Sequence, residues 1–286
     1  MIGECALFKT KSELRESHIY PKFVIDYTKK TGSRFLRKTV NPNKREQDGI
    51  KLHLLSHTAE QEFGKREKWF AENIFVPYLT ERKYTLPYNE NMYYFAVSFL
   101  WRVLVLNLKT DLNINKYWYY NLLIKAEKEW REYLANDKIP GKFSNINLMF
   151  TDRVLTNNSE LKGVDFYTTR VMDATIVDNK PHTCLLVYGK FNKFIFWGVL
   201  KDYGGEELLT DTRISPSRGV FRIPQKFEYF PIVSFLGNRI KEVSSFPLPN
   251  QSQQEKIEKE ILKDPIAFWN SDVGKSLFND KFNLDK

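Results

Sequence analysis

Two long stretches with helical spacing, followed by an abrupt change of pattern, constrain the fold most. Large apolar residues recur every three to four positions over 89–109 and 115–136, which predicts two helices with buried faces. After Pro140-Gly141 the pattern changes to short runs of β-branched and aromatic residues that predict strands. These runs lie at 146–150, 164–178, 183–188 and 194–200. Helices followed by antiparallel strands predict an α+β fold.

The remaining segments are assigned by the same rules. Apolar spacing predicts a helix from about 58 to Pro77, and runs on both sides of Gly237-Asn238 predict a hairpin over 230–243. The stretch 202–226 reads as irregular, and a polar linker leads into a helical tail. The predicted units are 1–85, a helical scaffold at 86–144, an antiparallel β-rich domain at 145–250 and the tail at 251–286.

Composition limits the class of protein. Hydrophobic residues make up 42% and aromatic residues 15% of the chain, which predicts an ordered globular fold. The two cysteines lie far apart and no apolar leader precedes Cys5, so we expect a cytoplasmic protein. The apolar run 94–108 is only fifteen residues long and contains Arg102, so we expect a buried helix and no membrane association.

The segment Ser17-His18-Ile19-Tyr20-Pro21-Lys22-Phe23 is the most distinctive motif. It combines with Cys5, with the stretch from Asn41 to Gly49, and with the stretch from Leu54 to Phe63. On these residues, positions 5 to about 78 resemble a family of prokaryotic HNH-type (treble-clef, ββα-metal) endonuclease-like proteins, some of them associated with defence against foreign DNA. The resemblance implies an N-terminal HNH-like lobe at 1–85.

The zinc knuckle of this family is degenerate here. Members with a complete knuckle carry two Cys-x-x-Cys pairs, which hold two loops on one zinc ion. This chain keeps Cys5 and has Phe8, Ser56 and Ala59 at the other three positions. We therefore expect no structural zinc and a lobe held together by apolar contacts.

The resemblance also implies candidate catalytic residues. His18 matches the family's general base, which activates a water molecule. Ser17 and Glu60 occupy the metal-ligand positions, and Glu60 is an oxygen ligand suited to Mg²⁺ or Mn²⁺. The asparagine that orients the base has no clear equivalent, and Asn43 or Asp48 are the candidates to replace it.

A rebuilt metal site is an alternative. His53 and His57 are four residues apart, and Cys5 would complete a softer zinc site with them. We favour a surface or capping role for His57, because Leu54-Leu55 is typical of a strand and Ser56 is a good helix N-cap.

Positive charge gathers beside His18. The formal net charge is +9, and nine Lys or Arg against three acidic residues lie between Lys22 and Lys51. Such a basic stretch predicts salt-sensitive binding to nucleic acid, with a solvated surface as the alternative. The candidate contacts are Lys22, Lys29, Lys30, Arg34, Arg37, Lys38, Lys44 and Arg45.

Other chemically suggestive residues are assigned structural roles. Thr168, Thr169, Arg170, Asp173 and His182 are interpreted as exposed turn residues, because no spacing rule groups them into a site. Cys184 is followed by Leu185-Leu186-Val187, which predicts a buried strand residue.

Three functions follow from these observations. The first is a nucleic-acid-binding, metal-dependent endonuclease of a prokaryotic defence system, acting on DNA in preference to RNA. The second is a catalytically inactive HNH-like subunit that binds nucleic acid or assembles with a protein encoded in the same operon. The third is a basic lobe that recognises another protein.

Overall fold

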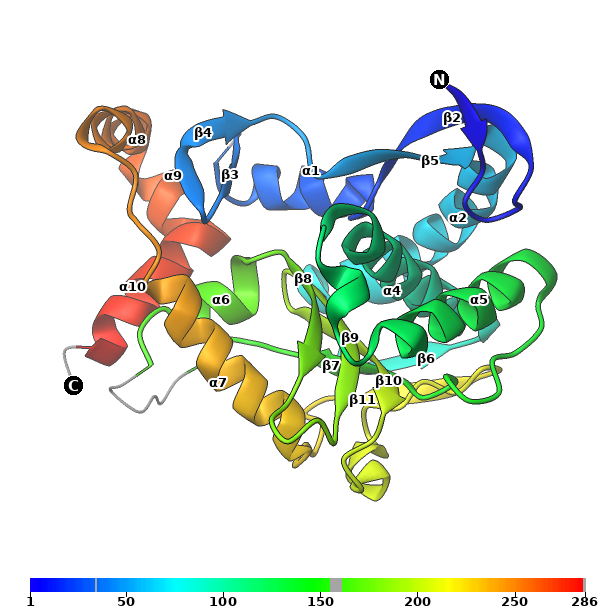
Figure 1. The fold of residues 1–286 in the computed structure, drawn as a ribbon. Coiled ribbons are helices and arrows are strands. Elements are labelled where there is room, and N and C mark those ends of the chain that lie inside the picture. Colours follow the sequence, from blue (N-terminus) through cyan, green and yellow to red (C-terminus); the bar gives the residue numbers. More distant parts are fainter. Residues whose placement is uncertain (34, 155–160, 285–286) are drawn as a thin grey trace.

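A computed structural model describes residues 1–33, 35–154 and 161–284. It shows a mixed fold of helices and antiparallel sheets that ends in a helical tail (Figure 1). This confirms the predicted α+β class.

The N-terminal part is a three-stranded sheet flanked by two helices. The strands pair antiparallel in the order β1-β2-β5, and a small hairpin, β3-β4, follows α1. His18 is the last residue of β2 and pairs with Lys51, the first residue of β5. The elements are β1 (Ile2–Glu4), β2 (Lys11–His18), α1 (Lys22–Lys30), β3 (Leu36–Lys38), β4 (Asn41–Glu46), β5 (Lys51–Ser56) and α2 (His57–Phe70).

The helix predicted from about 58 to near Pro77 is confirmed as a helical run of three consecutive elements. Ser56 caps α2 because its Oγ accepts a hydrogen bond from the amide of Ala59 at 3.3 Å. The helical path then passes through a π-helical turn, η1 (Ala71–Phe75), into α3 (Val76–Leu79). Pro77 lies in the first turn of α3, where proline is tolerated, so the helical run ends at Leu79, two residues beyond Pro77.

The middle of the chain supplies the two predicted scaffold helices. They are α4 (Glu90–Thr110), which is buried along most of its length, and α5 (Tyr120–Asn136). The predicted helix over 115–136 begins later than expected, because a short 3₁₀ turn, η2 (Ile114–Lys116), precedes it. Strand β6 (Thr85–Tyr88) leads into α4.

The larger sheet separates two layers of helices (Figure 1). Its antiparallel order is β7-β10-β9-β8, and α4 and α5 pack on one face while α7 covers the other. Gly189 and Gly198 permit this close packing, since a Cβ at either position would lie 2.6 Å from Phe99 or Trp130. The strands are β7 (Ile146–Phe150), β8 (Asp173–Asp178), β9 (Leu185–Phe191) and β10 (Phe194–Lys201).

Several predictions for the second half are wrong. The segment 164–178 is split into helix α6 (Val164–Arg170) and strand β8, and the predicted hairpin over 230–243 is helix α7 (Phe230–Ser244). Gly237 lies within α7, so it forms no turn. The space around its Cβ position is open. The irregular stretch contains a 3₁₀ turn, η3 (Glu206–Leu209), and β11 (Gly219–Arg222), which pairs with β6.

Four of the five polar residues interpreted as exposed are buried. Thr168, Thr169, Arg170 and Asp173 are each at most 9% exposed. Arg170 donates hydrogen bonds to Thr31 Oγ1 at 2.7 Å and to the Thr28 carbonyl at 2.8 Å. These side chains therefore join α6 and β8 to neighbouring elements.

The helical tail folds back onto the N-terminal part. It comprises α8 (Gln251–Lys263), α9 (Pro265–Asn270) and α10 (Asp272–Leu284). Asp272 accepts a hydrogen bond from Tyr27 of α1 at 2.8 Å, and Gln253 accepts one from Arg37 at 3.2 Å. The tail thus lies beside α1 and the β3-β4 hairpin (Figure 1).

One cluster of buried side chains runs from Cys5 to Phe221. It draws on the predicted units 1–85, 86–144 and 145–250, so these three share one core. Among the residues that the structure describes, no helix is both long and apolar enough to cross a bilayer.

Candidate functional site

The predicted base, His18, is held by a carboxylate. Its Nε2 lies 2.9 Å from Oδ1 of Asp48, which belongs to the turn between β4 and β5. The side chain of His18 is 22% exposed, so solvent reaches the ring. Of the two residues considered for orienting the base, the structure brings Asp48 to His18, whereas Asn43 accepts a hydrogen bond from the amide of Asn250.

Asp48 has three partners in this arrangement. Besides His18, its Oδ1 accepts from the amide of Gly49 at 3.0 Å, and its Oδ2 lies 2.5 Å from Nζ of Lys51. Partial burial tends to raise the pKa of Asp48, but the hydrogen bonds from Lys51, His18 and Gly49 outweigh it and hold the pKa well below its usual range. The carboxylate therefore stays ionised next to the imidazole.

The contact with Asp48 has a chemical consequence for the ring. With Nε2 donating to the carboxylate, the imidazole presents Nδ1 as an acceptor. This tautomer is inferred from the hydrogen bonds. Among the described residues, no side chain or backbone group forms a hydrogen bond with Nδ1 of His18, so this nitrogen can accept a proton from a water molecule.

The backbone of His18 is fixed by a buried arginine that the sequence did not point to as a site residue. Nη1 of Arg102 donates to the carbonyl of His18 at 3.0 Å and pairs with Glu67 of α2 at 2.8 Å. Arg102 is 3% exposed. A charged residue inside an apolar helix must find polar or charged partners. The position of Arg102 within the apolar run of α4 is therefore the sequence feature that predicts a buried contact.

The residues at the four positions predicted for a zinc knuckle lie near one another. The amide of Ser56 donates to Sγ of Cys5 at 3.3 Å, and Ala59 follows in the first turn of α2. Burial tends to raise the pKa of the Cys5 thiol, but hydrogen bonds from Phe8, Ser56 and Leu7 lower it overall. Cys5 is fully buried and Phe8 packs against the same core, so a hydrogen bond and the shared apolar core hold the two segments together.

The candidate metal ligands do not come together. Cys5 is buried whereas His53 and His57 are exposed. Glu60 lies in the first turn of α2, which follows the end of β5 opposite to the end that pairs with His18. Oε1 of Glu60 is buried without a hydrogen-bond partner. Across residues 1–33, 35–154 and 161–284, no three His, Cys, Asp or Glu side chains form a group suited to a metal ion.

The donors beside His18 do not fit a divalent cation in this arrangement. Mg²⁺ and Mn²⁺ need several free oxygen ligands, and both oxygens of Asp48 already have partners. Oγ of Ser17 is likewise engaged, since it accepts a hydrogen bond from the amide of Leu55 at 3.2 Å. No chemical step is therefore assigned to a metal.

The predicted nucleic-acid contacts divide into two groups. Arg37, Arg45 and Lys29 are partly buried: Arg37 bonds to Pro42 and Gln253, Arg45 lies over the ring of Phe35, and Lys29 bonds to the carbonyl of Gln47. The exposed group is Lys22, Lys30, Lys38 and Lys44. Arg34 lies outside the described residues.

Compared with known proteins, this chain matches no family model, no curated protein and no solved structure.

Proposed function

We propose that the protein binds nucleic acid through its basic N-terminal part and hydrolyses a phosphodiester with His18 as general base. The observation that carries the proposal is the contact of 2.9 Å between Nε2 of His18 and Oδ1 of Asp48. An oriented imidazole beside an ionised carboxylate is an arrangement suited to removing a proton from water.

The proposed chemistry uses groups of this chain. Nδ1 of His18 takes a proton from the attacking water, and the negative charge of Asp48 stabilises the resulting imidazolium. The water oxygen bonds to phosphorus while the P–O bond to the leaving oxygen breaks, and the leaving oxygen takes a proton from solvent. Lys51 partly balances the charge of Asp48. Arg102 holds the strand end that carries the base.

Two features support phosphate binding next to the base. Helix α1 begins four residues after His18 with no side-chain cap, and a helix N-terminus favours anions. The exposed lysines at 22, 30, 38 and 44 lie on α1 and the β3-β4 hairpin. Each phosphate contact would steepen the dependence of affinity on salt. From the resemblance to HNH-type proteins we infer that the substrate is DNA in preference to RNA, and that the protein acts in prokaryotic defence.

A second function is binding without cleavage, as a subunit of a larger complex. It is supported by apolar side chains exposed on the tail, which suit a protein partner. They include Leu262, Ile266, Trp269 and Phe278.

A cleavage assay tests the proposal. The full chain is incubated with DNA and with RNA, in buffers containing Mg²⁺, Mn²⁺ or EDTA. We expect His18→Ala to lower the cleavage rate about 10²-fold or more. His53→Ala is the matched control, because His53 is an exposed histidine of the neighbouring strand, and it should leave the rate unchanged.

The outcomes of the assay distinguish cleavage by His18, binding without cleavage and recognition of another protein. Cleavage that His18→Ala does not affect would overturn the role of His18. Salt-sensitive binding without cleavage in every buffer would favour the binding subunit. Absence of binding at low salt would overturn both and favour recognition of another protein.

A further inference from the structure

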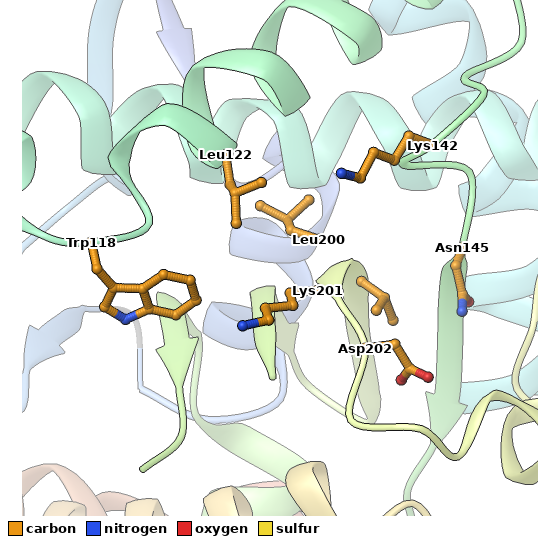
Figure 2. A pocket seen from close by; sticks show the side chains of 8 residues that line it. Trp118, Leu122, Lys142, Asn145, Leu200, Lys201 and Asp202 are labelled. Carbon is orange, nitrogen blue, oxygen red and sulfur yellow. The ribbon is translucent and has the colours of Figure 1, made fainter. Parts of the chain in front are cut away.

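A cavity of about 410 Å³ lies at the end of β10, far in sequence from His18. It is bounded by the start of α5, by the segment between α5 and β7, and by the last residues of β10 (Figure 2). Its apolar wall consists of Leu122, Val199 and Leu200. This size is in the range of small-molecule sites.

Two ammonium groups line the cavity, at Lys142 and Lys201. Lys201 is held in place, since its Nζ donates to the carbonyl of His182 at 2.6 Å and lies 4.9 Å from the ring centroid of Trp118. Of the carboxylates that the structure describes, none pairs with either lysine. Asp202 also lines the cavity, but it accepts hydrogen bonds from Tyr229 at 2.8 Å and from the amide of Gly204 at 2.9 Å.

Backbone strain lies beside the cavity, at a residue that contacts both Lys201 and Trp118. His182 has a φ of 67°, which is uncommon for a residue other than glycine. Asp178 accepts hydrogen bonds from Nδ1 of His182 at 2.9 Å and from Nε1 of Trp118 at 3.0 Å. The strained turn thereby positions Trp118 and, through its carbonyl, Lys201. Strain of this kind is concentrated at ligand sites.

We propose that this cavity binds a small organic anion. Its carboxylate or phosphate lies between Lys142 and Lys201, and its apolar body contacts Leu122, Val199 and Leu200. The proposal is independent of the one for His18, because the two sites share no residue. Failure of either leaves the other standing.

Calorimetric titration of the full chain with four matched probes tests the proposal. Phenyl phosphate and benzoate combine an apolar ring with an oxyanion, whereas inorganic phosphate lacks the ring and benzyl alcohol lacks the charge. We expect at least one ring-bearing anion to bind about tenfold or more tightly than both partial probes. The better of phenyl phosphate and benzoate identifies the oxyanion. Equal binding of benzyl alcohol, or no binding of any probe, would overturn the proposal.

Variants locate the binding. Lys142→Met and Lys201→Met should each raise the Kd of the bound probe about tenfold, the usual effect of losing a charged hydrogen-bond partner. Lys68→Met is the control, because Lys68 is an exposed lysine of α2 outside the cavity. Lys142 is exposed, so its variant should fold normally. An unchanged Kd in Lys142→Met and Lys201→Met would place binding elsewhere and overturn the proposal.

Discussion

At the scale of residues, the candidate site depends on a pairing across 30 positions of sequence. His18 and Asp48 meet because antiparallel pairing of β2 with β5 brings the end of one strand next to the start of the other. The carboxylate of Asp48 then contacts His18, Lys51 and the amide of Gly49 at the same time. The sequence presented Asp48 as one of two candidates, and only the register of the sheet selects it.

The lowered pKa of Asp48 predicts a pH-dependent contribution to stability. A carboxyl whose pKa is lower in the folded state stabilises that state above its unfolded pKa of about 3.9, and this stabilisation is lost as the pH falls through the folded value. We therefore expect Asp48→Asn to destabilise the protein at pH 7 and to have a smaller effect at pH 3. Urea unfolding at both pH values measures the difference.

Asp26→Asn is the control for removing one carboxylate, because Asp26 is exposed on α1. An equal loss of stability in Asp48→Asn at pH 7 and pH 3 would contradict the assigned interactions.

At the scale of elements, helix α7 shows how tertiary contacts override a local turn signal. Gly237-Asn238 between apolar runs is typical of a hairpin. The same residues also place Ile232, Leu236 and Ile240 on one helical face, which packs on the larger sheet and on α6. Burial of that face stabilises the helix more than a two-residue turn would stabilise an isolated hairpin.

An ion pair fixes α7 on the sheet and predicts a large mutational effect. Arg239 contacts both oxygens of Asp173, at 2.7 and 2.8 Å, and the Asp173 side chain is 8% exposed. Removing the arginine leaves a buried carboxylate without its charged partner. We expect Arg239→Met to lower the free energy of unfolding by about 3 kcal/mol, measured by urea titration.

Glu242→Gln provides the comparison on the same helix. Glu242 pairs with Arg239 at 2.7 Å but is 51% exposed, so its loss should cost less than about 1 kcal/mol. Similar losses for Arg239→Met and Glu242→Gln would show that the contact with Asp173 is not the stabilising one.

At the scale of the whole molecule, the N-terminal sheet and helix α2 belong to the same core as the scaffold helices. Cys5, Leu7, Leu54 and Phe63 are buried in the cluster that also contains α4 and β10. The apolar area removed from water there stabilises the region without requiring metal bonds. The chain should therefore unfold as one unit.

Thermal unfolding in a strong chelator tests this expectation. We expect a single transition with the same Tm in EDTA and in buffer containing Zn²⁺, because the buried residues of the N-terminal sheet pack in the same apolar cluster as α4 and β10. A fall in Tm on chelation, or a separate early transition of the N-terminal part, would contradict it.

The sequence by itself determined the helices with strong periodicity, the Ser56 cap, the strand before it and the burial of Cys184, because each follows from local spacing and burial preference. Tertiary structure alone decided the partner of His18, the burial of Arg170 and Asp173, and the helical state of 230–244. Register, ion pairing and the fold-back of the tail depend on residues far apart in sequence. Local patterns cannot encode which distant groups will meet, since that choice is made by the packing of the whole core.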